Sequence, residues 1–238
     1  LAFCFEWAGF VEHGESFVSK LPVAMDGSCS GIQHFSAMLR DEVGGGAVNL
    51  GPQELPADVY QLVANKVMEQ VEHDLLHGTE DELKHTEAGV AYVKQGTKAI
   101  AAQWKDFGIT RKVTKRSVMT LAYGSKEYGF KEQLMEDILR PAKQANKPFP
   151  FQGDGYQAAQ YMAKAIWVSV NKVLVKAGEA MKWLQGAASL AASEELPVRW
   201  STAVGFPVMQ AYADLEKRKV KTAINGKLVY LTMYQDKD

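Results

Sequence analysis

Apolar residues recur every three or four positions along most of the chain, a pattern that predicts helices. The clearest pattern begins at Pro56 and keeps apolar residues on one face as far as Leu75. One long helix is expected after Gly155, with a buried stripe from Met162 to Leu184. The other predicted helices are residues 1–20, with a loop at His13, residues 30–43, ended by the glycines 44–46, and residues 90–105 and 111–122.

Short apolar runs of strand length occur near both ends of the chain. Leu21–Met25 is followed by Asp26-Gly27, and the last two runs flank Asn225-Gly226, the strongest short hairpin signal. The acidic stretch 77–88 and the proline-rich stretch 141–155 are expected to be loops. With no internal repeat or flexible linker, the pattern predicts an α+β fold that is predominantly helical. The remaining predicted strands are Val198–Thr202, Val220–Ile224 and Leu228–Met233.

Composition narrows the class of protein. A chain of 238 residues suffices for one or two domains, and 47% apolar with 23% charged residues excludes a disordered chain. No run of 18 apolar residues predicts a membrane span, and the first residues lack a basic secretory leader. Two cysteines, Cys4 and Cys29, indicate a reducing compartment. The absence of an initial methionine predicts a segment of a longer chain.

The net charge is only −1, but the charges are unevenly distributed. Basic residues without acidic ones gather at 110–126 and again at 217–227, whereas 68–87 is strongly acidic. Two local basic patches on a neutral protein suit a polyanionic ligand held at defined places. Charge alone leaves the alternative open that these are solvated helix faces.

Asp26 is the first candidate for chemistry. A carboxylate at the end of a buried strand can face a cleft, and the glycine after it lets a ligand approach the backbone. Mg²⁺ prefers such hard oxygen ligands and takes few of them from protein. Taken alone, Asp26-Gly27 favours the simpler alternative of a turn.

The basic helix is the second candidate. Arg111 and Lys115 are four residues apart and share one face, and Tyr123 lies roughly 12 Å beyond Lys115 along a helix. That length is comparable to the distance from the phosphates of a nucleoside triphosphate to its sugar. Gly124 would end the helix and admit a nucleic-acid strand. Spacing alone favours a solvated basic face with a core tyrosine.

Other site types are not supported by the sequence. It has no phosphate-binding loop of the Walker type, no dinucleotide glycine motif and no nucleophile elbow. Its five histidines show no metal-ligand spacing. We expect His34 to be packed or hydrogen-bonded, not catalytic.

Two long motifs resemble those of one enzyme family. Residues 24–34 (AMDGSCSGIQH) resemble motif A of the single-subunit, phage-type DNA-dependent RNA polymerases, and residues 110–126 (TRKVTKRSVMTLAYGSK) resemble motif B. The resemblance covers the whole chain, is weakest at 77–90 and 141–155, and is closest to podovirus enzymes. It implies the palm and fingers portion of a right-hand polymerase fold. The implied regions are palm at 1–60, mainly fingers at 61–200 with the motif B helix at 111–123, and the start of the promoter-specificity hairpin region at 201–238.

The resemblance also implies roles for individual residues. Asp26 and the Gly27 carbonyl would bind metal. Lys115 would be the catalytic lysine beside the triphosphate, and Arg111 would hold the same phosphates. The other implied contacts are Tyr123 and Tyr60 with the incoming nucleotide, and Gly124, Ser125 and Tyr128 with the template strand.

The implied reaction is nucleotidyl transfer to an RNA 3′ end, supported by two Mg²⁺ ions. The implied partners are a DNA template and promoter, nascent RNA and nucleoside triphosphates. The complete enzyme is expected to be monomeric, to have no membrane association and to act in the cytoplasm of the infected bacterial host. The family's second metal-binding Asp lies in a His-Asp pair after the specificity hairpin. The one such pair here, His73-Asp74, lies upstream of motif B, so we expect this chain alone to make no RNA.

Two rival functions remain to be compared. Related DNA polymerases share Arg111, Lys115, Tyr123 and Gly124, but they carry a Glu five residues after the motif A Asp, where it blocks a 2′-hydroxyl. That position is Gly31 here, which favours RNA synthesis. A non-catalytic nucleic-acid-binding module would gain nothing from a carboxylate such as Asp26 facing a polyanion.

Overall fold

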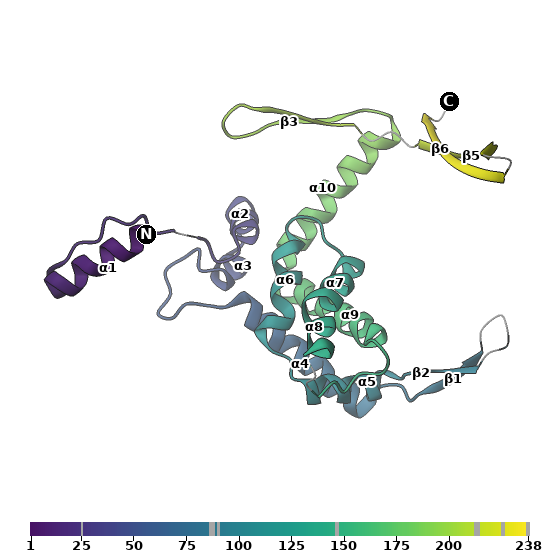
Figure 1. Ribbon diagram of the computed structural model, residues 1–238, viewed down its shortest axis with the longest axis horizontal. Helices are drawn as coiled ribbons and strands as arrows, with labels where there is room; N and C mark the ends of the chain where they lie inside the picture. The colour runs from purple at the N-terminus through teal and green to yellow at the C-terminus, as the bar shows by residue number, and fades with distance from the viewer. Residues whose placement is uncertain are drawn as a thin grey trace. The chain divides into compact units, whose positions relative to one another are not determined.

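The computed structural model describes residues 1–24, 26–85, 89, 91–145, 148–211, 215–224 and 227–236. These residues are mostly helical and form three antiparallel two-stranded sheets (Figure 1). The prediction of a predominantly helical α+β fold is therefore confirmed. Contacts divide the chain into two compact units, Leu1–Val173 and Leu174–Asp238.

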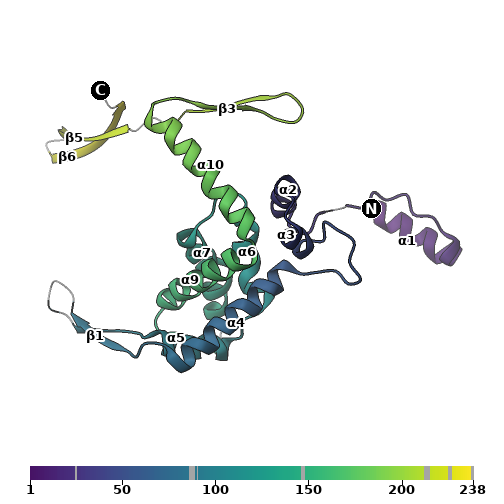
Figure 2. The ribbon, with the colours of Figure 1, turned by 180° about the vertical axis from the view of Figure 1, so that it is seen from behind.

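The first unit contains most of the helices and one hairpin. Its core is a group of packed helices in which α4 contacts α5, α6 and α9, and α7 contacts α9 (Figures 1 and 2). The elements are α1 (Ala2–His13), a 3₁₀ turn (Gly14–Ser16), α2 (Ser30–Leu39), α3 (Glu42–Ala47), α4 (Val59–His77), β1 (Glu82–His85), β2 (Ala91–Lys94), α5 (Thr97–Phe107), α6 (Arg111–Leu121), α7 (Glu127–Leu134), a π-helical stretch (Met135–Leu139), α8 (Arg140–Gln144) and α9 (Tyr156–Val173).

Trp104 anchors the centre of this helical group. Its side chain on α5 is fully buried, its ring packs 4.7 Å from that of Phe151, and its Nε1 donates to the Ala158 carbonyl of α9 at 2.9 Å. A buried indole needs such an acceptor, because an unpaired N–H away from water is destabilising. The bond therefore fixes α5 against α9, and α4 contacts both of these helices and α6.

The helices expected at 30–43, from Pro56 and at 111–122 are present as α2, α4 and α6, but α2 ends early. Arg40 takes the left-handed conformation, with φ 51°, and the Asp41 amide donates back to the Ser36 carbonyl. The three glycines that were expected to end the helix lie inside the separate helix α3. A left-handed residue, not a glycine, makes this stop.

The acidic stretch 77–88 is not simply a loop. Residues of β1 pair with β2, with Leu83 opposite Val93, so the helix expected from residue 90 begins only at Thr97. Side chain–backbone bonds close the base of the hairpin: the Gly96 amide donates to Asp81 at 2.7 Å and the Thr79 amide donates to Thr97 at 2.9 Å. The spacing of apolar residues gives no information about such hydrogen bonds, so the hairpin was not predicted from it.

Three further expectations need correction. Residues 21–24 form no strand, because no other strand pairs with them in the described part of the chain, and Met25 lies outside the described residues. The stretch 141–155 is partly helical, because the helical run that begins at Glu127 continues through α8 to Gln144 and includes Pro141. The long helix after Gly155 is two helices separated at Leu174 (φ −117°), and Leu184 at the end of its expected stripe is exposed.

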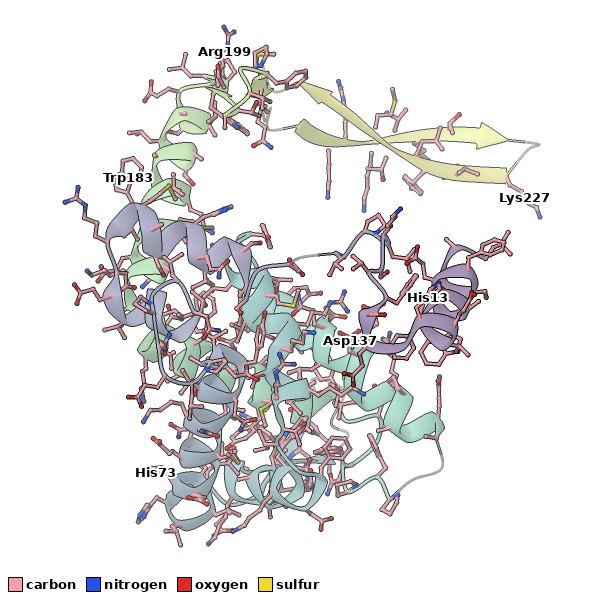
Figure 3. The ribbon with its side chains drawn as sticks, turned by 90° about the vertical axis from the view of Figure 1, so that its left-hand side faces the viewer. His13, His73, Asp137, Trp183, Arg199 and Lys227 are labelled. Atoms are coloured by element: carbon pink, nitrogen blue, oxygen red, sulfur yellow. The ribbon has the colours of Figure 1, made fainter. Side chains whose placement is uncertain are left out.

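The second unit contains α10 (Val175–Ser193) and two hairpins. β3 (Val198–Ser201) pairs with β4 (Pro207–Gln210), and β5 (Leu215–Ile224) pairs with β6 (Lys227–Asp236) with Val220 opposite Leu231. The three predicted strands are confirmed, whereas β4 was missed and the Asn225-Gly226 turn lies outside the described residues. Trp183 projects from α10 and is 72% exposed (Figure 3). No helix among the described residues has the length and apolar content needed to cross a bilayer.

Candidate functional site

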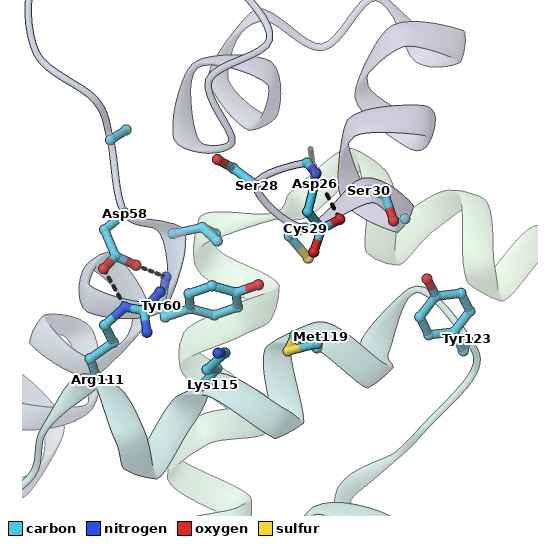
Figure 4. Close-up of a pocket in the computed structure, with 14 residues that line it drawn as sticks. Asp26, Ser28, Cys29, Ser30, Asp58, Tyr60, Arg111, Lys115, Met119 and Tyr123 are labelled. Carbon is cyan, nitrogen blue, oxygen red and sulfur yellow. Dashed lines mark hydrogen bonds and ion pairs between the residues drawn. The ribbon is translucent and has the colours of Figure 1, made fainter. Parts of the chain in front are cut away.

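A pocket of about 310 Å³ forms where three segments of the first unit meet (Figure 4). One wall is the turn before α2, the second is the start of α4, and the third is the exposed face of α6. The segments are far apart in the sequence. The lining residues are Asp26, Gly27, Ser28, Cys29, Ser30, Gly31, Ala57, Asp58, Val59, Tyr60, Arg111, Lys115, Met119 and Tyr123.

The α6 wall presents a row of side chains spaced four residues apart. Arg111, Lys115 and Met119 lie on its exposed face, and Tyr123 follows just after the helix ends. The opposite face, which includes Val113 and Val118, is buried against the helical group. Within the described residues the Lys115 ammonium has no ion-pair or hydrogen-bond partner. The pocket therefore contains a cation that is available to an anionic ligand.

Arg111 is held by the start of α4. Its Nε donates to Oδ2 of Asp58 at 2.5 Å, and its guanidinium carbon lies 4.8 Å from the centroid of the Tyr60 ring. The other carboxylate oxygen of Asp58 caps α4 by accepting from the amides of Tyr60 and Gln61 at 3.0 and 3.2 Å. One carboxylate thus joins the first turns of α4 and α6.

Tyr60 is a largely buried wall residue that is 8% exposed. Its carbonyl accepts from Oγ1 of the buried Thr114 at 2.8 Å, a second link between α4 and α6. Burial raises the pKa of the Tyr60 phenol, and the neighbouring Cys29 raises it further. Burial also raises the pKa of the Cys29 thiol. Both groups are therefore neutral near pH 7, and the charges of the pocket belong to Asp26, Asp58, Arg111 and Lys115.

Asp26 is exposed in the turn before α2. Its Oδ1 accepts from the Gly27 amide at 2.8 Å, which leaves the other carboxylate oxygen open. Gly27 has no room for a side chain, because a Cβ there would lie 2.5 Å from Oε1 of Gln33. Gln33 is itself fixed by donating to the Val48 carbonyl at 2.8 Å. The glycine is thus required by close packing around the Asp26 turn.

Gly31 also has a packing role that its sequence position did not reveal. A Cβ at Gly31 would lie 2.6 Å from the Cβ of Ala122 and 3.7 Å from Oη of Tyr123. The missing side chain therefore lets the start of α2 approach the end of α6. The prediction that Gly31 has no side chain to block a 2′-hydroxyl stays a prediction, and the close approach to Ala122 is a separate packing role.

The residues expected to border a template strand lie outside the pocket lining. Gly124, with φ 90°, and Ser125 follow the end of α6, and Tyr128 lies on α7 with 72% of its surface exposed. The Lys131 ammonium lies 4.3 Å from the centroid of the Tyr128 ring and donates to Oη of Tyr156 at 3.1 Å. Lys131 itself is buried and also pairs with Glu132 at 3.1 Å, so the exposed part of this group is mainly aromatic.

The structure describes both histidine positions that were singled out in the sequence. His34 was expected to be packed or hydrogen-bonded, but it is exposed on α2 and makes no hydrogen bond with the described residues. Asp74 of the His73-Asp74 pair accepts from the Tyr161 hydroxyl at 2.7 Å and from Gln70 at 3.0 Å. That carboxylate therefore links α4 to α9.

The sequence reasoning gave no role to several lining residues, among them Asp58, Met119 and Cys29. Asp58 carries a recognisable signal, because an Asp three residues before Gln61 at the start of an apolar run is an N-cap pattern. Met119 completes the four-residue spacing of the α6 face. Cys29 has no signal beyond its place in the motif. In the described part of the chain no three or more His, Cys, Asp or Glu side chains cluster as a metal site.

Comparison with known proteins identifies relatives over the whole length. The sequence pattern of the family described as DNA-dependent RNA polymerase matches residues 1–238. T7 RNA polymerase of Escherichia phage T7 is 50% identical over 99% of this chain, and the DNA-directed RNA polymerase of Enterobacteria phage T3 is 50% identical over 92%. The mitochondrial DNA-directed RNA polymerase of Mus musculus is 33% identical over the full chain. The matches span only 28%, 27% and 17% of these relatives, respectively.

Proposed function

The chain belongs to the DNA-dependent RNA polymerase family, and we propose that it forms the nucleotide-binding part of a longer enzyme that synthesises RNA on a DNA template. Its relatives are named DNA-directed RNA polymerases and are several times longer. The observation that carries the proposal is the pocket itself, where Asp26 lines the same cavity as Lys115 and Arg111. Asp58 of the same lining is paired with Arg111, and the carboxylate of Asp26 together with two cations suits a nucleotide whose phosphates are bound with a metal.

The α6 face supplies the nucleotide contacts. Lys115, free of other partners in the described residues, and Arg111 bind the triphosphate. Tyr123, which follows the end of α6 and lines the same pocket, contacts the sugar. Tyr60 forms the adjoining wall and approaches the incoming nucleotide. Lys115 also donates a proton to the departing pyrophosphate in this proposal.

The turn before α2 fits a magnesium ligand set. Asp26 offers an exposed carboxylate with one oxygen uncommitted, and the Gly27 carbonyl, which accepts from the Cys29 amide at 3.0 Å, has a second lone pair. Such hard oxygen ligands are those that Mg²⁺ takes from protein. When bound, Mg²⁺ would acidify the attacking 3′-hydroxyl and neutralise charge on the leaving phosphates.

The remaining surfaces are assigned to nucleic acid. Gly124, Ser125 and Tyr128 border the template strand, and the basic hairpin β5–β6 contacts promoter DNA. In this proposal residues 1–60 belong to the palm, 61–200 mainly to the fingers, and 201–238 to the start of the promoter-specificity region. The complete enzyme acts as a monomer in the cytoplasm of the infected bacterium.

A chimaera tests the function directly. The matching segment of T7 RNA polymerase is replaced by this chain, and RNA synthesis is measured on a primed DNA template with Mg²⁺ and either ribonucleotides or deoxynucleotides. We expect RNA synthesis that is lost in Asp26→Asn and retained in Lys112→Gln, an exposed α6 residue outside the pocket lining. An inactive chimaera that still binds DNA would favour a binding module, and one that prefers deoxynucleotides would favour a DNA polymerase. An active Asp26→Asn variant would refute the assigned site.

A further inference from the structure

We propose that Asp58 is a positioning residue that presents Arg111 to the phosphates of the incoming nucleotide. It holds Arg111 by Nε alone and leaves both terminal guanidinium nitrogens for phosphate oxygens. This inference rests on the proposed function, because it assumes that the pocket binds a triphosphate. Asp58 is not among the residues to which the sequence motifs assign a role.

The geometry divides the work of Asp58 between its two oxygens. Oδ1 is committed to the start of α4 through the amides of Tyr60 and Gln61. Oδ2 accepts from Nε of Arg111 (Figure 4). Because the α4 cap fixes the carboxylate, the position of Oδ2 is determined by the helix and not by a free side-chain rotation.

Arginine chemistry makes the choice of nitrogen important. A guanidinium has five N–H donors in a rigid planar fork, and Nε contributes one of them. With Nε used by Asp58, the two terminal nitrogens keep four N–H donors, and the two that point outward suit bidentate contact with phosphate. The Tyr60 ring, 4.8 Å from the guanidinium carbon, restricts the plane of the fork further.

The expected benefit is orientation and not stability. The Asp58 and Arg111 side chains are 39% and 46% exposed, and exposed ion pairs contribute little to folding. A flexible arginine loses rotamer freedom when it binds phosphate, and a side chain that is already held loses less. Asp58 should therefore tighten nucleotide binding even though its own charge repels phosphate.

The repulsion between Asp58 and phosphate leads to the opposite prediction for KM. If Asp58 acted mainly as an anion competing for Arg111, removing its charge would free the arginine and lower KM for the nucleotide. If it positions Arg111, removing the contact raises KM. The sign of the change in KM therefore separates the two roles.

The experiment uses Asp58→Ser in the T7 polymerase chimaera, because serine retains the N-cap and is too short to reach Arg111. We expect KM for ribonucleotides to rise about tenfold, equivalent to about 1.4 kcal/mol, with kcat changed by less than about threefold because uniform binding is lost. In an Arg111→Met background the same Asp58→Ser change should add nothing, since its effect passes through Arg111. Thermal melting checks that the cap is intact, and Asp58→Asn, also a good N-cap, replaces serine if that variant melts early.

The outcomes separate this inference from the proposed function. An unsubstituted chimaera that makes no RNA refutes both. An active chimaera in which Asp58→Ser leaves KM unchanged or lowers it refutes the positioning role alone. A loss of the same size in the Arg111→Met background also refutes it, because a purely structural residue would impair both backgrounds equally.

Discussion

Replacing Gly31 by alanine should disable the pocket by pushing two of its walls apart. The added Cβ would lie 2.6 Å from the Cβ of Ala122. Non-bonded carbon atoms prefer separations of about 3.5–4.0 Å, so the start of α2 and the end of α6 must move apart by about 1 Å. Because a displacement of about 1 Å in a catalytic arrangement can reduce the rate about 10²-fold, we expect kcat/KM to fall about a hundredfold.

A second substitution tests the cause. Ala122→Gly removes the atom that the new methyl group would meet, and residue 122 is the C-cap of α6, where glycine is tolerated better than in the helix interior. The double variant Gly31→Ala/Ala122→Gly should recover to within about tenfold of the parent. The assay is steady-state RNA synthesis by the T7 polymerase chimaera on a primed template, with thermal melting to confirm folding. Near-normal activity of Gly31→Ala alone, or no recovery in the double variant, would refute the packing argument.

Two other substitutions and one deletion test separate features. Tyr123→Phe removes a hydroxyl that has no hydrogen-bond partner in the described residues, so it should spare folding but raise the relative kcat/KM for deoxynucleotides roughly 5- to 150-fold, the equivalent of about 1–3 kcal/mol; unchanged discrimination would place the selector elsewhere. Tyr161→Phe removes the bond to Asp74 and should destabilise the first unit of the 238-residue chain by about 1.5–3 kcal/mol in urea unfolding at pH 7. Burial and that bond raise the pKa of Tyr161 in the folded chain. The free energy of unfolding of the parent should therefore fall as pH rises above about 10, the pKa of tyrosine in the unfolded chain, and the Tyr161→Phe variant should lack this part of the fall. Parallel plots of unfolding free energy against pH for the two proteins would contradict the reasoning. Deleting residues 220–231 from the chimaera should abolish promoter-specific initiation but spare elongation on a primed template, whereas equal loss of both would make the hairpin structural.

Helices with one apolar face were predictable from the sequence. In α4, Val63, Val67 and Val71 recur at helical spacing and are all buried, so the pattern contains the packing information directly. The same holds for α6, where Val113, Val118 and Leu121 face the core. Local periodicity is sufficient where a helix packs on a single side.

The elements that were predicted wrongly depend on interactions between residues that are distant in the sequence or that lie outside the apolar pattern. The β1–β2 hairpin is closed by Asp81 and Thr97, which bond to backbone amides across its base. The separation of α9 from α10 at Leu174 lies within a continuous apolar stripe, and no proline or glycine marks it. Polar bonds and backbone conformations of this kind leave no trace in the spacing of apolar residues.

The pocket was predictable only in part for a related reason. Residue type and motif identified Asp26, Arg111 and Lys115, all of which line it. Asp58 was missed because an isolated acidic residue before a helix is usually read as a solvated cap, and only the fold brings Arg111 within reach of it. The close approach of Gly31 to Ala122 likewise requires two segments that are distant in sequence.

The Asp58 carboxylate, which bonds to both α4 and Arg111, connects the free energy of triphosphate binding with the free energy of forming the first turn of α4. If a triphosphate binds only when the first turn of α4 is formed, then by reciprocity its binding stabilises that turn, by about 2.7 kcal/mol at a concentration 100 times Kd. Hydrogen exchange of the Tyr60 and Gln61 amides, both bonded to Asp58, should then slow by about 100-fold when exchange occurs through local opening of that turn. Two backbone amides on the far side of an arginine thus become reporters of whether the phosphate site is filled.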